Sequence, residues 1–197
     1  MAATYPPLVT LAARMLSVVG HPGLLVPGAV AVAASGAEVS PQLLPVALAT
    51  AVAVAVIVGL YSLWQVRVGR WQHIDASQPR ERHQLNLFLA VLLCGTAALL
   101  WALGQPRSVA LGPLLAAGVV GLTHLLRRWL KVSLHVAFAL FALTLVWPHP
   151  VLTPAVALLT AGVAWSRVVL GRHTPAEVWL GLLFGASGGA AFRAFVA

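Results

Sequence analysis

Residues 43–64, LLPVALATAVAVAVIVGLYSLW, decide the fold class of this chain. These 22 residues contain no charged side chain, and a helix of about 20 apolar residues is long enough to cross the hydrocarbon core of a membrane. The rest of the sequence has the same character, because 60% of its 197 residues are hydrophobic and only 8% are charged. This composition excludes an ordinary water-soluble domain, so we expect an integral membrane protein.

Apolar runs on both sides of this stretch predict further membrane-spanning helices. Before it, residues 23–37 predict one span, and residues 11–22 predict either an interfacial amphipathic helix or the first half of the same, kinked span. After it, the candidates are residues 85–103, residues 108–126, two spans within the uncharged stretch 132–166, and a last span after residue 177. The break between the two spans of 132–166 is WPHP, whose prolines cannot continue a helix.

The sequence therefore predicts an all-α fold, a polytopic membrane helical bundle of six to seven transmembrane helices. No linker or soluble segment interrupts it, so we expect a single membrane domain over residues 1–197. In the last span, Gly181, Gly185 and Gly189 recur every four residues. Such a face of small residues predicts close packing against a neighbouring helix.

Basic side chains gather on one side of the predicted bundle. With seven spans, the N-terminus and the loops at 65–84, 127–131 and 167–175 share a side. That side carries Arg14, Arg67, Arg70, Arg80, Arg82, Arg127, Arg128, Lys131, Arg167 and Arg172, and the other carries Arg107 and Arg193. Cytoplasmic loops are rich in lysine and arginine, so we expect this side to face the cytoplasm of a bacterial inner (cell) membrane. The clusters alternate with apolar runs, a pattern that does not indicate a nucleic-acid partner.

Three polar segments meet on the basic side: residues 71–86, 127–135 and 166–177. Ionisable groups at membrane depth are costly, so such a concentration indicates a functional site. Histidines, arginines, a lysine and a serine together suit phosphoryl transfer. Cations and hydroxyls neutralise the phosphoryl oxygens, one imidazole attacks phosphorus and another protonates the leaving oxygen.

Two of these segments resemble known signatures. Ser166-Arg167, five residues, His173, three residues and Glu177 resembles the third signature of the type 2 phosphatidic acid phosphatase superfamily, where the acidic residue is usually aspartate. Lys131-Val-Ser133-Leu-His135 is similar to the second signature, normally Pro-Ser-Gly-His. The resemblance covers a phosphatase-like core over residues 70–190.

The first signature of that family, a lysine, six residues and then Arg-Pro, has no equivalent here. The chain has no lysine except Lys131 and no Arg-Pro, and it offers Arg80 and Arg82 in the corresponding segment. Either these arginines hold phosphate in a variant way, with Lys131 supplying the missing ammonium, or the site is altered or inactive.

The resemblance implies a role for each matching residue. His173 would be the nucleophile that forms a phosphohistidine, Glu177 would orient its ring, and His135 would act as general acid and then as base. The residues expected to bind the substrate are Lys131, Ser133, Arg167, Arg80 and Arg82, with a backbone amide near Leu134. Neither a metal nor a cofactor is implied.

The residues themselves support and qualify these roles. Positions 173 and 177 share a face if the segment is helical, and a helix start near Pro175 would aim free amides at an anion. Thr174-Pro-Ala-Glu177 is also a capping box, a structural role that can coexist with ring orientation. His21 and His149, beside prolines at helix breaks, are expected to be loop or cap residues.

Three functions fit these patterns. The first is a metal-independent lipid phosphate phosphatase, a phosphoric monoester or diphosphate hydrolase whose substrate is a lipid phosphate or an isoprenoid diphosphate such as undecaprenyl diphosphate. The second is a non-catalytic binding or transport protein for an anionic lipid or solute. The third is a histidine-ligated haem or metal protein. The sequence leaves the substrate and the oligomeric state open.

Overall fold

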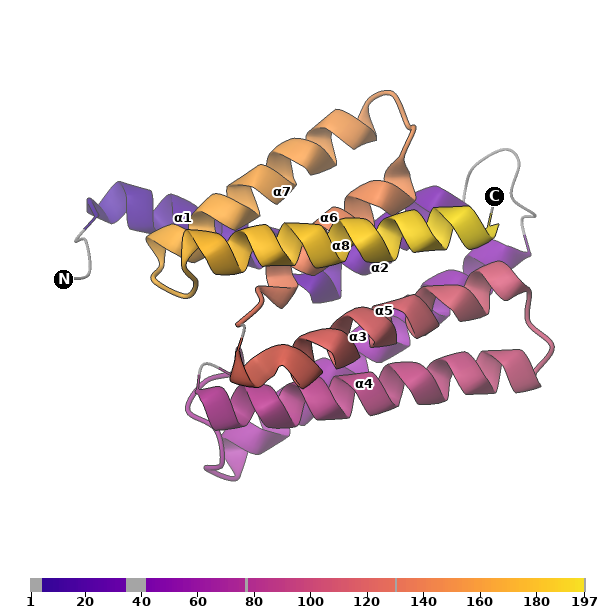
Figure 1. The fold of residues 1–197 in the computed structure, drawn as a ribbon, viewed down its shortest axis with the longest axis horizontal. Helices are drawn as coiled ribbons and strands as arrows, with labels where there is room; N and C mark the ends of the chain where they lie inside the picture. Colours follow the sequence, from indigo (N-terminus) through magenta and orange to yellow (C-terminus); the bar gives the residue numbers. More distant parts are fainter. Residues whose placement is uncertain (1–4, 35–41, 77, 130, 197) are drawn as a thin grey trace.

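The computed structural model describes residues 5–34, 42–76, 78–129 and 131–196, and within them it contains helices and no strand. The helices are α1 (Pro7–Val19), α2 (Pro22–Ala34), α3 (Leu43–Arg67), α4 (Pro79–Ala102), α5 (Arg107–Leu125), the short 3-10 helix η1 (Leu126–Arg128), α6 (Leu134–Val146), α7 (Leu152–Val169) and α8 (Pro175–Val196). Figure 1 shows them as a bundle elongated along one axis. The predicted all-α membrane bundle is confirmed.

Among the described residues, five helices are long and apolar enough to cross a membrane. They are α3, α4, α5 with η1, α7 and α8. The pair α1 and α2 passes the same test together, with a bend of 51° between the two helices, so it is either a broken sixth span or a re-entrant loop. Helix α6 is apolar but has only 13 residues. Five or six long candidate spans and one short apolar helix are consistent with the six to seven predicted; residues 35–37 of the predicted first span lie outside the described residues.

The bend between α1 and α2 follows from the residues at the junction. Pro22 occupies the first position of α2, where a proline costs no helical hydrogen bond. Gly20 is buried, and a Cβ added to it would overlap the side chain of Val163 in α7. The chain therefore changes direction where it touches α7, so that α1 packs on α7 and α2 packs on α3 and α6.

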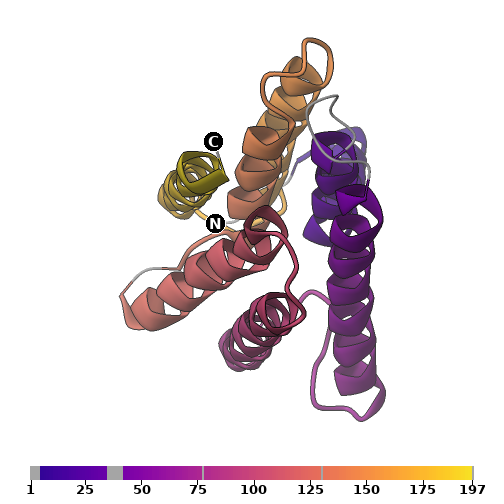
Figure 2. The same ribbon diagram turned by 90° about the vertical axis from the view of Figure 1, so that its right-hand side faces the viewer.

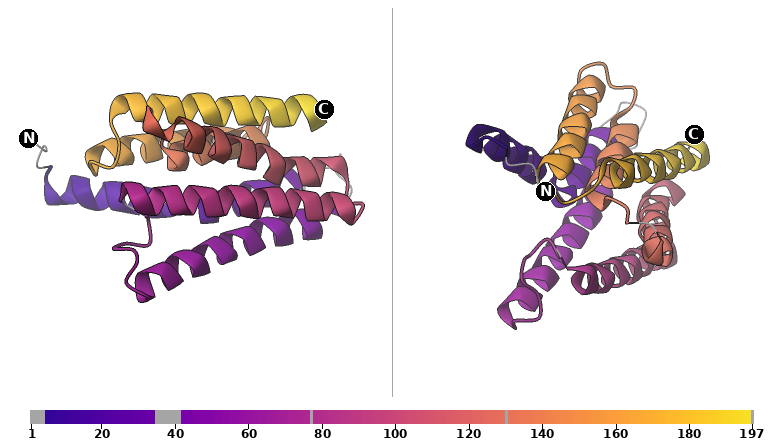
Figure 3. Two further views of the ribbon diagram at one scale, coloured as in Figure 1. Left: turned by 60° about the horizontal axis from the view of Figure 1, so that its bottom comes forward. Right: turned by 60° about the vertical axis from the view of Figure 1, so that its left-hand side comes forward.

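Helix α6 lies at the centre of the packing. It contacts α2, α7 and α8, while α8 also packs on α5 and α5 on α4. Figure 2, seen along the long axis, shows α4 with α5, α2 with α3, and α6 with α7 and α8 as three groups of helices. In the left view of Figure 3 the long helices run lengthwise along the bundle, with α3 tilted away from the others. Their ends therefore meet at two opposite ends of the bundle, and one of these collects the predicted site residues.

The glycine face of α8 sets its distance from α6. A Cβ added to Gly181 would lie 2.7 Å from the carbonyl oxygen of Ser133, and one at Gly185 would overlap the backbone of Ala137. A Cβ at Gly189 would overlap Thr144. The predicted small-residue face is thus the contact with α6, and it brings the first turn of α8 against the start of α6.

Candidate active site

The turn between α7 and α8 places His173 beside Arg167. Gly171 has a φ of 63°, a left-handed conformation that glycine adopts without strain. The chain then folds back, so that the carbonyl oxygen of Arg167 accepts hydrogen bonds from the amides of Arg172 (3.0 Å) and His173 (3.1 Å). Ser166 donates its hydroxyl to Val163 O at 2.7 Å and is fully buried. Ser166 therefore stabilises the end of α7 and has no hydroxyl proton free for a ligand.

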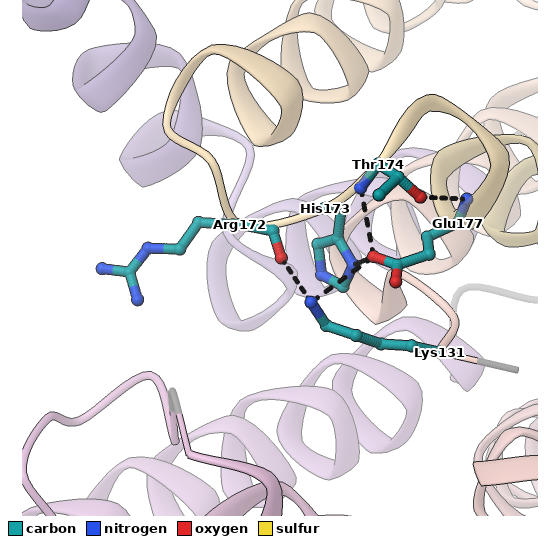
Figure 4. A network of polar contacts seen from close by, with 5 residues as sticks. All are labelled: Lys131, Arg172, His173, Thr174 and Glu177. Atoms are coloured by element: carbon teal, nitrogen blue, oxygen red, sulfur yellow. Dashed lines mark hydrogen bonds and ion pairs between the residues drawn. The ribbon is translucent and has the colours of Figure 1, made fainter. Parts of the chain in front are cut away.

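Glu177 in the first turn of α8 holds the ring of His173. Glu177 Oε2 lies 3.0 Å from His173 Nδ1 and accepts a hydrogen bond from the amide of Thr174 at 3.1 Å. The amide of Glu177 in turn donates to Thr174 Oγ1 at 3.3 Å. The capping box and the ring contact thus coexist on one carboxylate (Figure 4). Because the box uses the amides of Thr174 and Glu177, the prediction that free amides at this helix start face an anion is corrected for these two.

Lys131 closes the same network from the segment before α6. Its Nζ donates to the carbonyl oxygen of Arg172 at 2.9 Å and lies 3.4 Å from Glu177 Oε2. Figure 4 shows the side chain of Arg172 extending away from the network, so only its carbonyl takes part. The ammonium of Lys131 compensates the charge of Glu177. An anionic substrate would therefore compete with Glu177 for this ammonium.

Burial keeps the ring of His173 neutral. Its side chain is 8% exposed, and this burial lowers the pKa of His173 to about 4, against the opposing hydrogen bond to Glu177. A neutral ring facing a carboxylate carries its proton on Nδ1 and donates it to Glu177. The lone pair of the other nitrogen, Nε2, is then available at neutral pH, as a nucleophile requires.

Three buried polar atoms near His173 have no hydrogen-bond partner among the described residues: Ser133 Oγ, His135 Nε2 and Arg167 Nε. Ser133 is fully buried and Arg167 is 5% exposed. Ser133 precedes α6 but makes no side-chain cap to it, and its amide donates to Glu177 O at 3.3 Å. Arg167 and His173 both lie close enough to His135 for an electrostatic interaction, and buried polar groups are nearly always paired, so the unpaired atoms around His173 indicate a binding site.

The start of α6 adds backbone donors to these side chains. The first amides of an α-helix have no acceptor within the helix and carry partial positive charge. Here they follow Ser133, whose hydroxyl leaves them uncapped. Together with the guanidinium of Arg167 they form an environment suited to an anion.

The two predicted arginines of α4 differ from each other. Arg82 is half-buried and close enough to Glu177 for an electrostatic interaction. Arg80 is exposed and has no hydrogen bond or ion pair with any described residue. The structure therefore gathers His173, Glu177, Lys131, Ser133, His135 and Arg167, which we call the candidate site, with Arg82 near it. Arg80 is not among them, because its side chain is exposed in the first turn of α4 and makes no hydrogen bond or ion pair with these residues.

The sequence analysis missed two contributors, Ser17 near the end of α1 and His21 at the α1–α2 junction. Arg167 Nη1 donates to Ser17 Oγ at 2.9 Å. The ring of His21 lies edge-on to that of His135, with centroids 5.1 Å apart. His21 is indeed a cap, as predicted, since its Nδ1 accepts from the amide of Gly23 at 3.1 Å. No local pattern could pair residues separated by well over a hundred positions.

Comparisons with known proteins do not add to this geometry. No family model, curated protein or solved structure matches the chain. Within the described parts of the chain, no group of three or more histidine, cysteine, aspartate or glutamate residues could hold a metal ion. The candidate site itself therefore carries the functional argument.

Proposed function

We propose that this protein is a membrane phosphatase that hydrolyses a lipid phosphate or isoprenoid diphosphate through a phosphohistidine, as a variant of the type 2 phosphatidic acid phosphatase superfamily. The single observation that carries the proposal is the set of unpaired buried atoms on Ser133, His135 and Arg167 beside a neutral, carboxylate-oriented His173. This set provides a nucleophile, a proton donor and oxygen-binding groups without a metal.

In the first step, His173 Nε2 attacks phosphorus. A bond forms between nitrogen and phosphorus while the bond from phosphorus to the leaving oxygen breaks. His135, which becomes cationic when the anionic phosphate binds beside it, gives the proton on its Nε2 to that oxygen, so a lipid alcohol, or a lipid monophosphate from a diphosphate, departs. Glu177 stabilises the positive charge that develops on the ring of His173, since its Oε2 is already 3.0 Å from Nδ1.

In the second step, water replaces the histidine. His135, now neutral, takes a proton from the water while the water oxygen attacks phosphorus and the phosphorus–nitrogen bond breaks. Inorganic phosphate leaves, His173 returns to its neutral form and His135 is again protonated. Protons and charges therefore balance over the cycle without an external cofactor.

The phosphoryl oxygens would be held by groups that are already in place. Ser133 Oγ and Arg167 Nε are buried donors without partners among the described residues. The uncapped backbone amides of the first turn of α6, which follow Ser133, are further donors at the same place. Donors fixed in a poorly solvated site stabilise charge that develops in the transition state more strongly than water does. The apolar tail of the substrate would remain in the membrane between or beside the helices.

The test is release of inorganic phosphate by the detergent-purified protein. The substrates are a panel of lipid monophosphates and isoprenoid diphosphates, with a metal chelator present and His173→Ala prepared alongside. Turnover that survives the chelator and disappears in the variant supports the proposal. Absence of turnover on every substrate, from wild-type protein shown to be folded, contradicts it.

A second candidate is a binding or transport protein that uses the same anion-binding groups without hydrolysis. The observation that favours it is the exposed position of Arg80, which leaves Arg82 as the one of the two predicted α4 arginines that lies near the site. This function predicts that phosphate binding survives His173→Asn and is lost in Arg167→Gln, with no phosphate release from the wild type.

A further inference from the structure

The junction of α1 and α2 inserts two polar side chains beside the candidate site. Gly20 packs on Val163 and Leu16 on Gly162, so the junction touches the last two turns of α7. Ser17, one turn before the junction, accepts from Arg167 Nη1 at 2.9 Å. His21, at the junction itself, contacts the ring of His135. An apolar turn would satisfy the packing requirement, so these two polar contacts need a separate explanation.

The contact with Ser17 fixes one end of the Arg167 guanidinium. Arg167 is 5% exposed, and a buried arginine needs partners for its five N–H groups. Ser17 takes one of them, while Nε is left without a partner. The side chain is therefore anchored at Nη1 with another donor still available for an anion.

The cap contact fixes the ring of His21. Its Nδ1 accepts from the amide of Gly23 at 3.1 Å, so the neutral ring carries its proton on Nε2. The ring is then held in one orientation and one tautomer against His135, with an angle of 81° between the ring planes. His135 Nε2 is buried and has no partner among the described residues, so its position depends on the rings and helices packed around it.

We propose that the α1–α2 junction is a functional wall of the phosphate site, in which Ser17 positions Arg167 and His21 positions His135. This inference rests on the proposed function and extends it to a part of the chain that the phosphatase-like core does not include. Its ligand is the phosphoryl group of the substrate.

The first test compares Ser17→Ala with Ser17→Thr. Loss of the hydroxyl frees Nη1 of Arg167, so KM and the inhibition constant of inorganic phosphate should rise about 10-fold with a smaller change in kcat. Threonine keeps a hydroxyl and should restore most of the affinity. The matched control is Thr10→Ala on the same helix, whose hydroxyl donates to Pro6 O at 3.3 Å on an exposed surface, and it should leave both constants unchanged.

The second test separates the two nitrogens of His21. Asparagine keeps an acceptor at the position of Nδ1, and glutamine places an amide nitrogen near the position of Nε2. If the ring positions His135, His21→Asn should lower kcat about 10-fold with KM nearly unchanged, even though the cap is kept. His21→Gln should recover part of that loss. His149→Asn is the control, because His149 Nδ1 caps α7 in the same way, accepting from Val151 and Leu152 at 3.3 and 3.2 Å.

The two proposals fail in different ways. Stabilisation of the protein by inorganic phosphate, measured as a thermal shift, needs no turnover. A wild type without phosphatase activity, whose phosphate-induced shift is lost in Ser17→Ala, contradicts the proposed function and supports the junction as a binding wall. Turnover that is lost in His173→Ala but unchanged in both Ser17→Ala and His21→Asn overturns the inference about the junction alone.

Discussion

Two helices of this protein begin with the same cap and use its carboxylate differently. At the start of α8, Glu177 accepts from the amide of Thr174 and also holds the ring of His173. At the start of α4, Glu81 accepts from the amide of Gln78 at 3.0 Å and from that of Gln72 at 2.8 Å. Glu81 thereby ties the loop before α4 to the helix, whereas Glu177 reaches a titratable ring. The comparison shows that the same capping motif can hold only backbone amides, as at α4, or can also orient a titratable ring, as at α8.

The largest expected effect comes from removing the group that Glu177 holds. On the proposed function, His173→Ala removes the nucleophile and should reduce phosphate release by about 10⁴-fold or more. The readout is initial-rate phosphate release in detergent, with far-UV circular dichroism to show that the helices remain. Retention of more than a tenth of the wild-type rate would exclude His173 as nucleophile.

The next effect distinguishes the roles of Glu177 and Glu81 by comparing the kcat and the stability of their glutamine variants. Glu177→Gln weakens orientation of the ring and should lower kcat by about 10²-fold or more, with about 1 kcal/mol of stability lost from the cap. Glu81→Gln should cost about 2 kcal/mol of stability, because a 4% exposed carboxylate loses charged hydrogen bonds, and leave kcat unchanged. Rates and thermal unfolding are measured on both variants; equal losses of kcat would remove the distinction between the two caps.

A smaller effect tests whether α8 must approach α6 closely. In Gly181→Ala the new methyl group lies 2.7 Å from Ser133 O, so the helices must separate, at about 1–3 kcal/mol of stability and a loss of activity. Gly118→Ala on α5 meets nothing within 4 Å and should gain up to about 1 kcal/mol from helix propensity. Opposite signs in thermal unfolding support the packing argument, and loss of stability in both variants contradicts it.

The smallest effect concerns pH. A histidine with a pKa of about 4 is still mostly neutral at pH 5, so kcat/KM should fall little between pH 7 and 5 from this group, and its acid limb should lie near pH 4. The unfolded ring has the ordinary pKa of about 6.5. The unfolded state therefore binds more protons between these values, and the stability that the buried neutral ring contributes is lost as pH falls from 6.5 through 4.

Profiles of kcat/KM and of thermal unfolding against pH check both statements. An acid limb of kcat/KM centred near pH 6.5 would contradict the neutral, buried state of His173. Glu177→Gln sharpens the comparison, because loss of a hydrogen bond that raises the pKa of His173 should move its acid limb to lower pH.

The sequence predicted those features that depend on local spacing. Long uncharged runs specified the membrane helices, and the four-residue interval from His173 to Glu177 specified their contact, because both are properties of one segment. The closeness of Lys131 and Ser133 to that pair depended on the packing of α6 against α8, which the glycine face only indicated. The contributions of Ser17 and His21 could not be predicted, since they arise from a bend at Gly20 and a contact with α7.

The position of the start of α6, set back from the start of α8, has an electrical consequence. Its start lies level with Gly181, six residues into α8, which is about 9 Å along the helix axis. If the hydrocarbon core, about 30 Å thick, begins level with the first residue of α8, a phosphoryl group bound there sits roughly a third of the way into it. Each negative charge brought to that depth would cross a similar fraction of a transmembrane voltage, about 0.8 kcal/mol per 100 mV. In a polarised membrane, substrate affinity on the proposed function would therefore depend on voltage, with a sign set by the side from which the phosphate enters.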